Sequence, residues 1–314
     1  MDTVRFQKLI EIPACSGGYS LVTKSVANDG SLLFLSIESS GAAAVREMHE
    51  SGIGVFAKTR MNEARRFRLS LARPDGSLQT IQLPPLDITF PLVDVFPNGR
   101  ILLVAPRCEW RGPGDYDLNA VIFDPTTAGM SRILLGDGIN RAYVDALGRI
   151  WVAYFDEGVF GNFGWGSPGA GQIGSAGLIC FSVFGEKIWE YPPVSNMVDC
   201  YALNVSNAQA AIYFYTDFPL CRISEDFKLA CCETELHGCH HFAIAETSVL
   251  FSGQYDDPPD AGYLGRFSAG EALKTRRVQL QLPDGSPLPK GQLLGRGEHL
   301  YFFDEYAAYR ASVD

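Results

Sequence analysis

Residues 143–191 read YVDALGRIWVAYFDEGVFGNFGWGSPGAGQIGSAGLICFSVFGEKIWEY, and they predict one four-stranded antiparallel sheet. A short first strand ends in the turn Ala146-Leu147-Gly148, and a strongly apolar second strand covers residues 149–155. A long glycine-rich loop leads to a third strand at residues 177–183. The turn Phe184-Gly185 then opens a fourth strand at residues 186–191.

The second strand of this sheet is apolar on both faces. Ile150, Val152 and Tyr154 share one face, and Trp151, Ala153 and Phe155 share the other, because successive side chains of a strand alternate. A strand that is apolar on both faces is covered on both sides. Propeller blades meet this condition, because each sheet stacks on the next.

The same unit of inner strand, tight turn and apolar strand occurs six times along the chain. Equivalent turn positions are held by Gly30, Gly99, Gly148, Asn207, Thr247 and Gly297. Most of these residue types favour tight turns, and the interval of roughly 50 residues lies in the range of propeller repeats. The prediction is an all-β fold, a six-bladed β-propeller of four-stranded antiparallel blades, forming a single domain over residues 1–314.

The first and last copies of the repeat are irregular. The sixth copy stops after three strands, so we expect the N-terminal strand at residues 4–12 to complete the last blade and close the ring. The first copy carries an insertion at residues 38–65, in which residues 42–50 predict a short helix. A degenerate seventh blade in this insertion is the alternative.

Composition excludes several classes of function. The net charge of −10 argues against nucleic-acid binding, which depends on Lys and Arg contacts to phosphate. Neither a signal peptide nor an apolar run long enough for a membrane span is visible, so we expect a cytoplasmic protein that does not bind membranes. In that compartment the eight cysteines are expected to be thiols and not a disulfide framework.

The segment Gly148-Arg149-Ile150-Trp151-Val152 is similar to the Asp-Gly-Arg-Ile-Trp-Val phrase common in propeller blades, with Leu147 where an Asp is usual. The chain therefore resembles six-bladed propellers of the broad NHL-repeat, TolB-like and gluconolactonase-like kind, and within these a group of uncharacterised bacterial propellers. The resemblance covers the whole chain but implies no particular activity.

Polar and aromatic residues follow the second strands, where a propeller places its loops around one end of the central channel. We expect the ligand-binding residues on this loop face to be Arg107, Trp110, Asp156, Glu157, Trp165, Tyr255, Asp256 and Asp304. The glycine-rich loop at residues 161–177 is expected to be an adaptable lid, since long loops are often functional.

A second set of residues offers metal ligands on the same face. Carboxylates suit Ca²⁺ or Mg²⁺ and histidines suit transition metals, so the candidates for a divalent cation are Asp156, Asp217, His237, His240 and His241. The alternative is that acids at strand ends simply face solvent. No cofactor motif is evident beyond this possible ion.

Three functions stay open at this point. The favoured one is a binding module for a protein or small-molecule ligand, since no nucleophile elbow or phosphate-binding loop occurs in the sequence. The alternative is a metal-dependent hydrolase or lactonase with carboxylates and histidines at the channel mouth. A structural platform without a pocket is the third. No catalytic residue is assigned, and the balance is against an enzyme.

Overall fold

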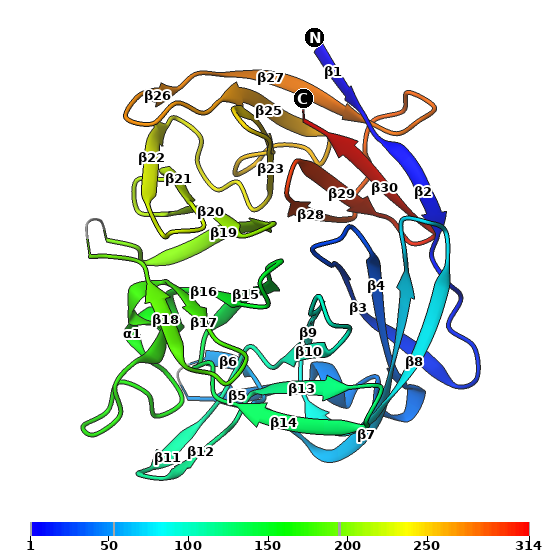
Figure 1. The fold of residues 1–314 in the computed structure, drawn as a ribbon, viewed down its shortest axis with the longest axis vertical. Helices are drawn as coiled ribbons and strands as arrows, with labels where there is room; N and C mark the ends of the chain where they lie inside the picture. Colours follow the sequence, from blue (N-terminus) through cyan, green and yellow to red (C-terminus); the bar gives the residue numbers. More distant parts are fainter. Residues whose placement is uncertain (1, 53, 194–195, 314) are drawn as a thin grey trace. The chain divides into compact units, whose positions relative to one another are not determined.

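The computed structural model describes residues 2–52, 54–193 and 196–313, and the chain is a six-bladed β-propeller built of small antiparallel sheets (Figure 1). Its contacts divide into two compact units of three blades each. The first unit is Pro13–Ser195, and the second unit is Met1–Ile12 together with Asn196–Asp314.

The first unit holds blades one to three, each with its strands paired in chain order. Blade one has β3 (Tyr19–Val26), β4 (Leu32–Glu38), β7 (Arg60–Ala72) and β8 (Leu78–Ile88). Blade two has β9 (Leu92–Val95), β10 (Ile101–Val104), β13 (Ala120–Asp124) and β14 (Gly129–Ile133). Blade three has β15 (Ile139–Val144), β16 (Ile150–Tyr154), β17 (Leu178–Phe181) and β18 (Lys187–Glu190).

The second unit holds blades four to six. Blade four has β19 (Asp199–Ser206), β20 (Gln209–Tyr215), β21 (Leu220–Ile223) and β22 (Leu229–Thr234), with β26 (Ala272–Leu273) added in parallel. Blade five has β23 (Phe242–Ile244), β24 (Ser248–Ser252), β25 (Ala261–Arg266) and β27 (Thr275–Gln281). Blade six has β28 (Gln292–Arg296), β29 (His299–Phe303), β30 (Ala307–Ser312) and β2 (Gln7–Glu11).

Blade three matches the sheet predicted from residues 143–191, with shorter strands. All five residues of β16 are buried, as a strand covered on both faces requires. Its neighbours pair in the expected order, with Trp151 opposite Tyr143 on β15 and Cys180 on β17. The Trp151 indole Nε1–H donates to the buried Asp145 carboxylate at 3.0 Å, so this core tryptophan keeps its polar group satisfied.

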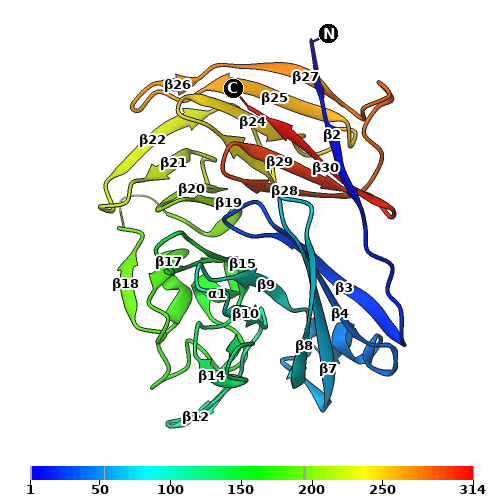
Figure 2. The same ribbon diagram turned by 45° about the vertical axis from the view of Figure 1, so that its right-hand side comes forward.

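The N-terminal segment divides between two blades. Residues 7–11 form β2 and pair antiparallel with β30, which makes β2 the fourth strand of blade six. The preceding β1 (Asp2–Arg5) instead pairs in parallel with β27 of blade five. The prediction of a single strand over residues 4–12 is therefore wrong, because the chain forms two strands with the buried Phe6 between them. Figure 2 shows the N-terminal segment running from β27 to β30. Closure of the ring stays a prediction.

The insertion in blade one contains no short α-helix at residues 42–50, and that prediction is wrong for this stretch. Two 3₁₀ turns, η1 (Ser39–Gly41) and η2 (Ala44–Arg46), precede a two-stranded sheet of β5 (Met48–Ser51) and β6 (Gly54–Ala57). Val45 of η2 packs into the apolar cluster between blades one and two. In the part of the chain that is described, this ribbon takes the place of a seventh blade.

The expectation of eight free thiols is wrong for two cysteines. Cys221 on β21 and Cys231 on β22 lie directly opposite each other and form a disulfide. Within the described residues, the other six cysteines form no disulfide, and five of them are buried. Within the described residues, no helix has the length and apolar character needed to cross a membrane.

Candidate functional site

The buried Asn119 joins the two ends of the loop between β10 and β13. Asn119 Nδ2 donates to the carbonyl oxygens of Ala105 at 2.8 Å and Gly136 at 2.9 Å, and Asn119 Oδ1 accepts the backbone N–H of Leu135 at 3.0 Å. The loop of blade two is thereby tied to the segment that leads into blade three. The hydrogen bonds of Asn119 therefore anchor the backbone of residues 106–118, which carries the side chains described next.

Arg107 is a buried cation at the centre of this region. Its guanidinium donates to both carboxylate oxygens of Asp137, from Nε at 3.0 Å and from Nη2 at 2.9 Å, while Nη1 lies 2.5 Å from Glu157 Oε2. Burial raises the pKa of Asp137 to about 6, and the charge of Arg107 opposes that rise. The bidentate geometry makes this a strong, orienting ion pair. Phe163 lies against the guanidinium, whose Cζ is 4.5 Å from the ring centroid.

A second buried carboxylate, Asp117, binds one arginine of the same loop, Arg111, and one of β7, Arg60. It accepts hydrogen bonds from the backbone N–H of Glu109 at 3.0 Å, from Arg111 Nη1 at 2.9 Å and from Arg60 Nη2. Burial raises the pKa of Asp117, but these hydrogen bonds outweigh burial and hold it below its usual value. The charged groups of this loop are therefore engaged in structural pairs.

The aromatic side chains are positioned by backbone hydrogen bonds and remain partly open to solvent. Trp165 Nε1 donates to the Cys108 carbonyl at 3.0 Å, and the Trp110 backbone N–H donates to the Phe163 carbonyl at 2.9 Å. Tyr116 lies 6.2 Å from the Trp165 ring and is 40% exposed. We call Trp110, Tyr116, Phe163 and Trp165 the tryptophan face.

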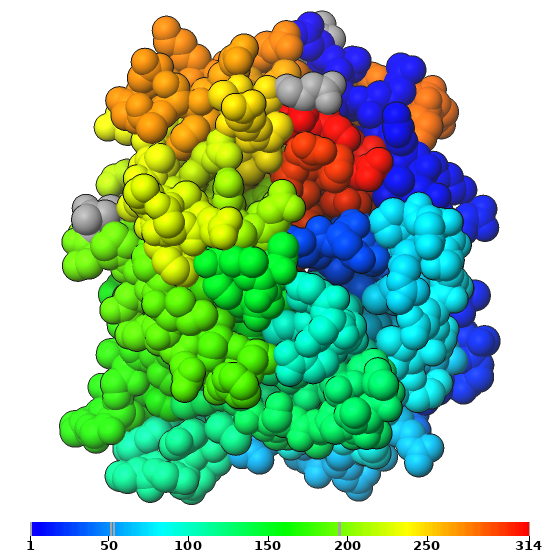
Figure 3. Space-filling model, viewed as in Figure 1, coloured from blue at the N-terminus to red at the C-terminus, as the bar shows by residue number. Residues whose placement is uncertain are grey.

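Two short strands carry part of this surface. Trp110 and Tyr116 pair across the ribbon of β11 (Trp110–Gly112) and β12 (Asp115–Tyr116), which lies at the outside of the first unit (Figure 3). Beside Tyr116 is a hollow of about 320 Å³, bordered by Leu118 and by the ion pairs Arg60–Asp117 and Arg132–Asp87. The tryptophan face thus combines aromatic rings held in place with an adjacent hollow.

The glycine-rich loop at residues 161–177 approaches the Trp110 backbone closely at Gly164, and its role as an adaptable lid stays a prediction. It follows α1 (Asp156–Phe160), and η3 (Ile173–Ala176) lies near its end. Gly164 has a φ of +88°, and a Cβ at this position would lie 2.0 Å from the Trp110 carbonyl oxygen. Only glycine permits this backbone contact, so Gly164 allows the loop to approach Trp110 closely.

In the second unit, two of the predicted histidines lie against a cluster of tyrosines. The His240 ring stacks on Tyr201 with centroids 5.0 Å apart, and His237 meets Phe218 edge-on at 5.4 Å. The hydroxyl of Tyr255 donates to that of Tyr201. We call Tyr201, Phe218, His237, His240 and Tyr255 the tyrosine–histidine cluster, and its chemistry is aromatic stacking.

The other predicted residues lie in separate local structures. Asp156 is exposed and accepts the backbone N–H of Glu157, and Asp217 is exposed beside Thr216. Asp256 is exposed in a turn, where its φ is +63°. Asp304 stabilises its own turn by accepting the backbone N–H groups of Tyr306 and Ala307. His241 is half-buried, and its carbonyl accepts the backbone N–H of Ser252.

The first unit therefore brings Arg107, Trp110, Glu157 and Trp165 together, and the second brings His237, His240 and Tyr255 together. Over the described ranges, no group of three or more His, Cys, Asp or Glu side chains is arranged to hold a metal ion. Burial raises the pKa of the Cys108 thiol far above its usual value, which makes Cys108 an unsuitable nucleophile.

Sequence reasoning missed the carboxylates that organise the site, Asp137 and Asp117, together with Tyr116. A signal for Asp137 exists, because it lies between Gly136 and Gly138, two glycines with positive φ directly before β15. A carboxylate in such a backbone turn can reach an arginine of the preceding loop. Asp117 and Tyr116 carry no comparable signal.

Comparison with known proteins identifies the fold. A family model described as the YxzG family matches residues 173–311, which is less than half of the chain. No curated protein matches. The structure is similar to that of virginiamycin B lyase from Staphylococcus aureus, with 10% identity, a TM-score of 0.50 and coverage of 98% of this chain and 99% of that one.

Two further solved structures are similar over nearly their whole length. A streptogramin B lyase structure has 12% identity and a TM-score of 0.49, and covers 97% of both chains. A structure of YCF48 bound to D1 peptide has 9% identity and a TM-score of 0.49, and covers 100% of this chain and 98% of that one. The sheet topology defines the class of protein, a six-bladed β-propeller, while the narrower NHL-repeat, TolB-like or gluconolactonase-like relationship stays a prediction.

Proposed function

We infer that this propeller is a non-catalytic binding module that holds a partner protein on the tryptophan face. The observation that carries the inference is that Trp110, Tyr116 and Trp165 are fixed by local pairing and backbone hydrogen bonds while remaining partly exposed. Rigid aromatic side chains lose little conformational entropy on binding, and Trp, Tyr and Arg dominate the energetics of protein interfaces.

The state of the charged groups supports binding over catalysis. Arg107 is paired with both Asp137 and Glu157, and Asp117 is occupied by Arg60 and Arg111. A general acid or base must be able to exchange a proton with a bound substrate. These groups instead hold the loops in place, and the adjacent hollow of about 320 Å³ can accept a side chain of the partner.

Site-specific photocrosslinking in cells tests this function. A photoreactive amino acid at Tyr116 is expected to capture a specific partner, whereas the same amino acid at Phe184 is expected not to capture it. Phe184 is a matched control because it is 77% exposed in the turn between β17 and β18, and the glycine-rich loop meets β17 at its other end. Identical products at both positions would contradict the proposal.

The alternative, a metal-dependent hydrolase or lactonase, would draw its ligands from Asp156, Asp217 and the predicted histidines. For the binding module, adding Zn²⁺ or Ca²⁺, or removing metal with a chelator, is expected to change the melting temperature by less than about 1 °C, because an ion that does not bind the folded state cannot stabilise it. Thermal melts of the purified protein measure this. A rise of several degrees that disappears in His240→Ala would favour the hydrolase.

A further inference from the structure

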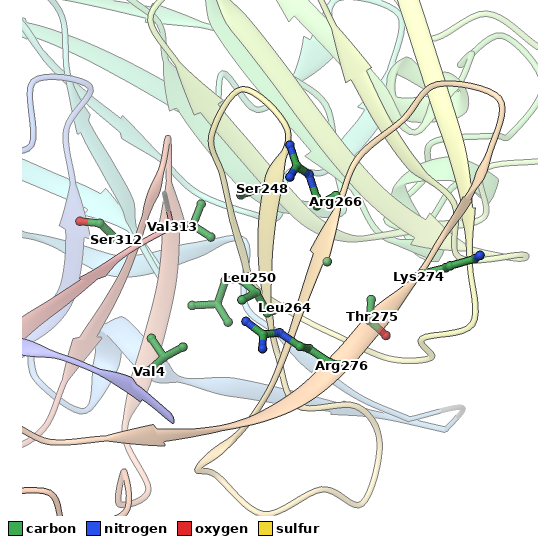
Figure 4. A pocket seen from close by; sticks show the side chains of 11 residues that line it. Val4, Ser248, Leu250, Leu264, Arg266, Lys274, Thr275, Arg276, Ser312 and Val313 are labelled. Carbon is green, nitrogen blue, oxygen red and sulfur yellow. The ribbon is translucent and has the colours of Figure 1, made fainter. Parts of the chain in front are cut away.

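The second unit contains a hollow that is bordered by three cationic side chains, in a protein with a net charge of −10. Its volume is about 630 Å³, within the range of small-molecule sites. One face of blade five lines it through β24, β25 and β27, and β1 and the end of β30 complete the wall (Figure 4). The tryptophan face belongs to the first unit and contributes no residue to it.

The registers of blade five explain how apolar and cationic side chains come to share this face. Leu264 pairs with Leu250 on one side and with Arg276 on the other, and Ser248 pairs with Arg266. Paired residues and residues two apart on a strand point to the same side of a sheet. Gly265 lies between Leu264 and Arg266, and a Cβ there would come within 3.0 Å of the Lys274 carbonyl oxygen.

The side chains that line the hollow form an apolar floor with a cationic rim. The floor is provided by Val4, Leu250, Leu264 and Val313, and Ser248, Thr275 and Ser312 also border the hollow. The three cations are Arg266, Lys274 and Arg276, and the described lining contains no Asp or Glu. In a chain with a net charge of −10, this concentration of positive charge favours an anion.

Two of the three cations have no carboxylate partner among the residues described. Arg276 forms an ion pair with Asp2, which shows that a carboxylate can be held at this wall. Arg266 donates to the Thr247 hydroxyl at 3.2 Å, and Lys274 forms no ion pair with a described residue. Figure 4 places the Arg276 guanidinium next to Leu250 and Leu264, so charge and apolar surface are adjacent.

We propose that this hollow binds a small amphipathic anion, with its carboxylate or phosphate head at Arg266 and Lys274 and its apolar body on Leu264 and Leu250. An arginine favours the planar or tetrahedral oxygens of such head groups, and the floor removes the apolar body from water. The site is independent of the binding function inferred for the tryptophan face.

Calorimetric titration of the full chain with octanoate, octyl phosphate, octanol and inorganic phosphate tests the proposal. Binding of octanoate or octyl phosphate is expected, and whichever binds tighter identifies the head group. Octanol and inorganic phosphate are each expected to bind at least tenfold more weakly than the preferred anion. The proposal would be overturned if octanol or inorganic phosphate bound as tightly as the preferred anion. It would also be overturned if neither octanoate nor octyl phosphate bound.

Variants locate the bound anion. The double variant Arg266→Ala/Lys274→Ala is expected to weaken binding at least tenfold, and raising the salt concentration is expected to weaken it in the unmodified protein. Arg277→Ala is the matched control, because Arg277 is the neighbour of Arg276 on β27, points to the other face and pairs with Asp257. If Arg277→Ala weakened binding as much as the double variant, or if the affinity did not depend on salt, the proposed site would be wrong.

Discussion

Arg107→Ala is expected to lower the free energy of unfolding of the first unit by about 3–5 kcal/mol, the usual cost of leaving a buried charge without its partner. The variant leaves Asp137 buried, and it also removes the cation that holds Glu157 of α1. Urea unfolding followed by tryptophan fluorescence measures this unit selectively, because all four tryptophans, at positions 110, 151, 165 and 189, belong to it.

Two further variants separate charge burial from loss of contacts. Arg132→Ala removes a half-exposed arginine with one partner, Asp87, and is expected to cost only about 0–1 kcal/mol. Adding Asp137→Asn to Arg107→Ala removes the uncompensated charge and is expected to restore part of the lost stability. A cost below about 1 kcal/mol for Arg107→Ala would mean that the ion pair does not organise the loops.

Asn204→Ala is expected to destabilise the second unit by about 3 kcal/mol or more, because each buried polar group that loses its partner costs roughly 1–3 kcal/mol. Asn204 Nδ2 donates to the carbonyl oxygens of Phe242 at 2.8 Å and Gly297 at 2.9 Å, and its Oδ1 accepts the Gly297 backbone N–H at 2.6 Å. One side chain on β19 thus joins blade four to the start of β23 and to the turn after β28.

Hydrogen exchange read by mass spectrometry localises this effect. Peptides covering β23 and β28 are expected to exchange faster in Asn204→Ala, while peptides of the first unit keep their rates unless the two units unfold together. Gln209→Ala is the control, since Gln209 is exposed on the neighbouring β20. Unchanged protection of β23 and β28 would show that Asn204 does not hold these strands together.

Much of the fold follows from local sequence. Buried strands such as β16 are apolar on both faces, and tight turns such as the one at Gly148 require a positive φ, so both leave a readable pattern. The two parallel additions, β1 on blade five and β26 on blade four, were not predicted. They depend on which sheet edge is open to a distant segment, and residues 2–5 carry no sign of that partner.

The site was harder to predict because its organisation depends on pairing between loops. Arg107, Trp110, Glu157 and Trp165 were identified as polar or aromatic residues after apolar strands, and they lie together. Their common partners could not be identified, because a carboxylate such as Asp117 has the same sequence signature whether it is buried or solvated. The disulfide was missed for a related reason, since the register that sets Cys221 opposite Cys231 is a property of the sheet.

Calorimetric titration of the crosslinked partner into the purified propeller tests the central claim most directly. Trp110→Ala and Tyr116→Ala are each expected to weaken binding at least tenfold, equivalent to about 1.4 kcal/mol, while Phe184→Ala keeps the affinity of the unmodified protein. Circular dichroism of the variants must show an intact fold. An affinity that is unchanged by both substitutions on the tryptophan face, in folded protein, would contradict the proposed binding function.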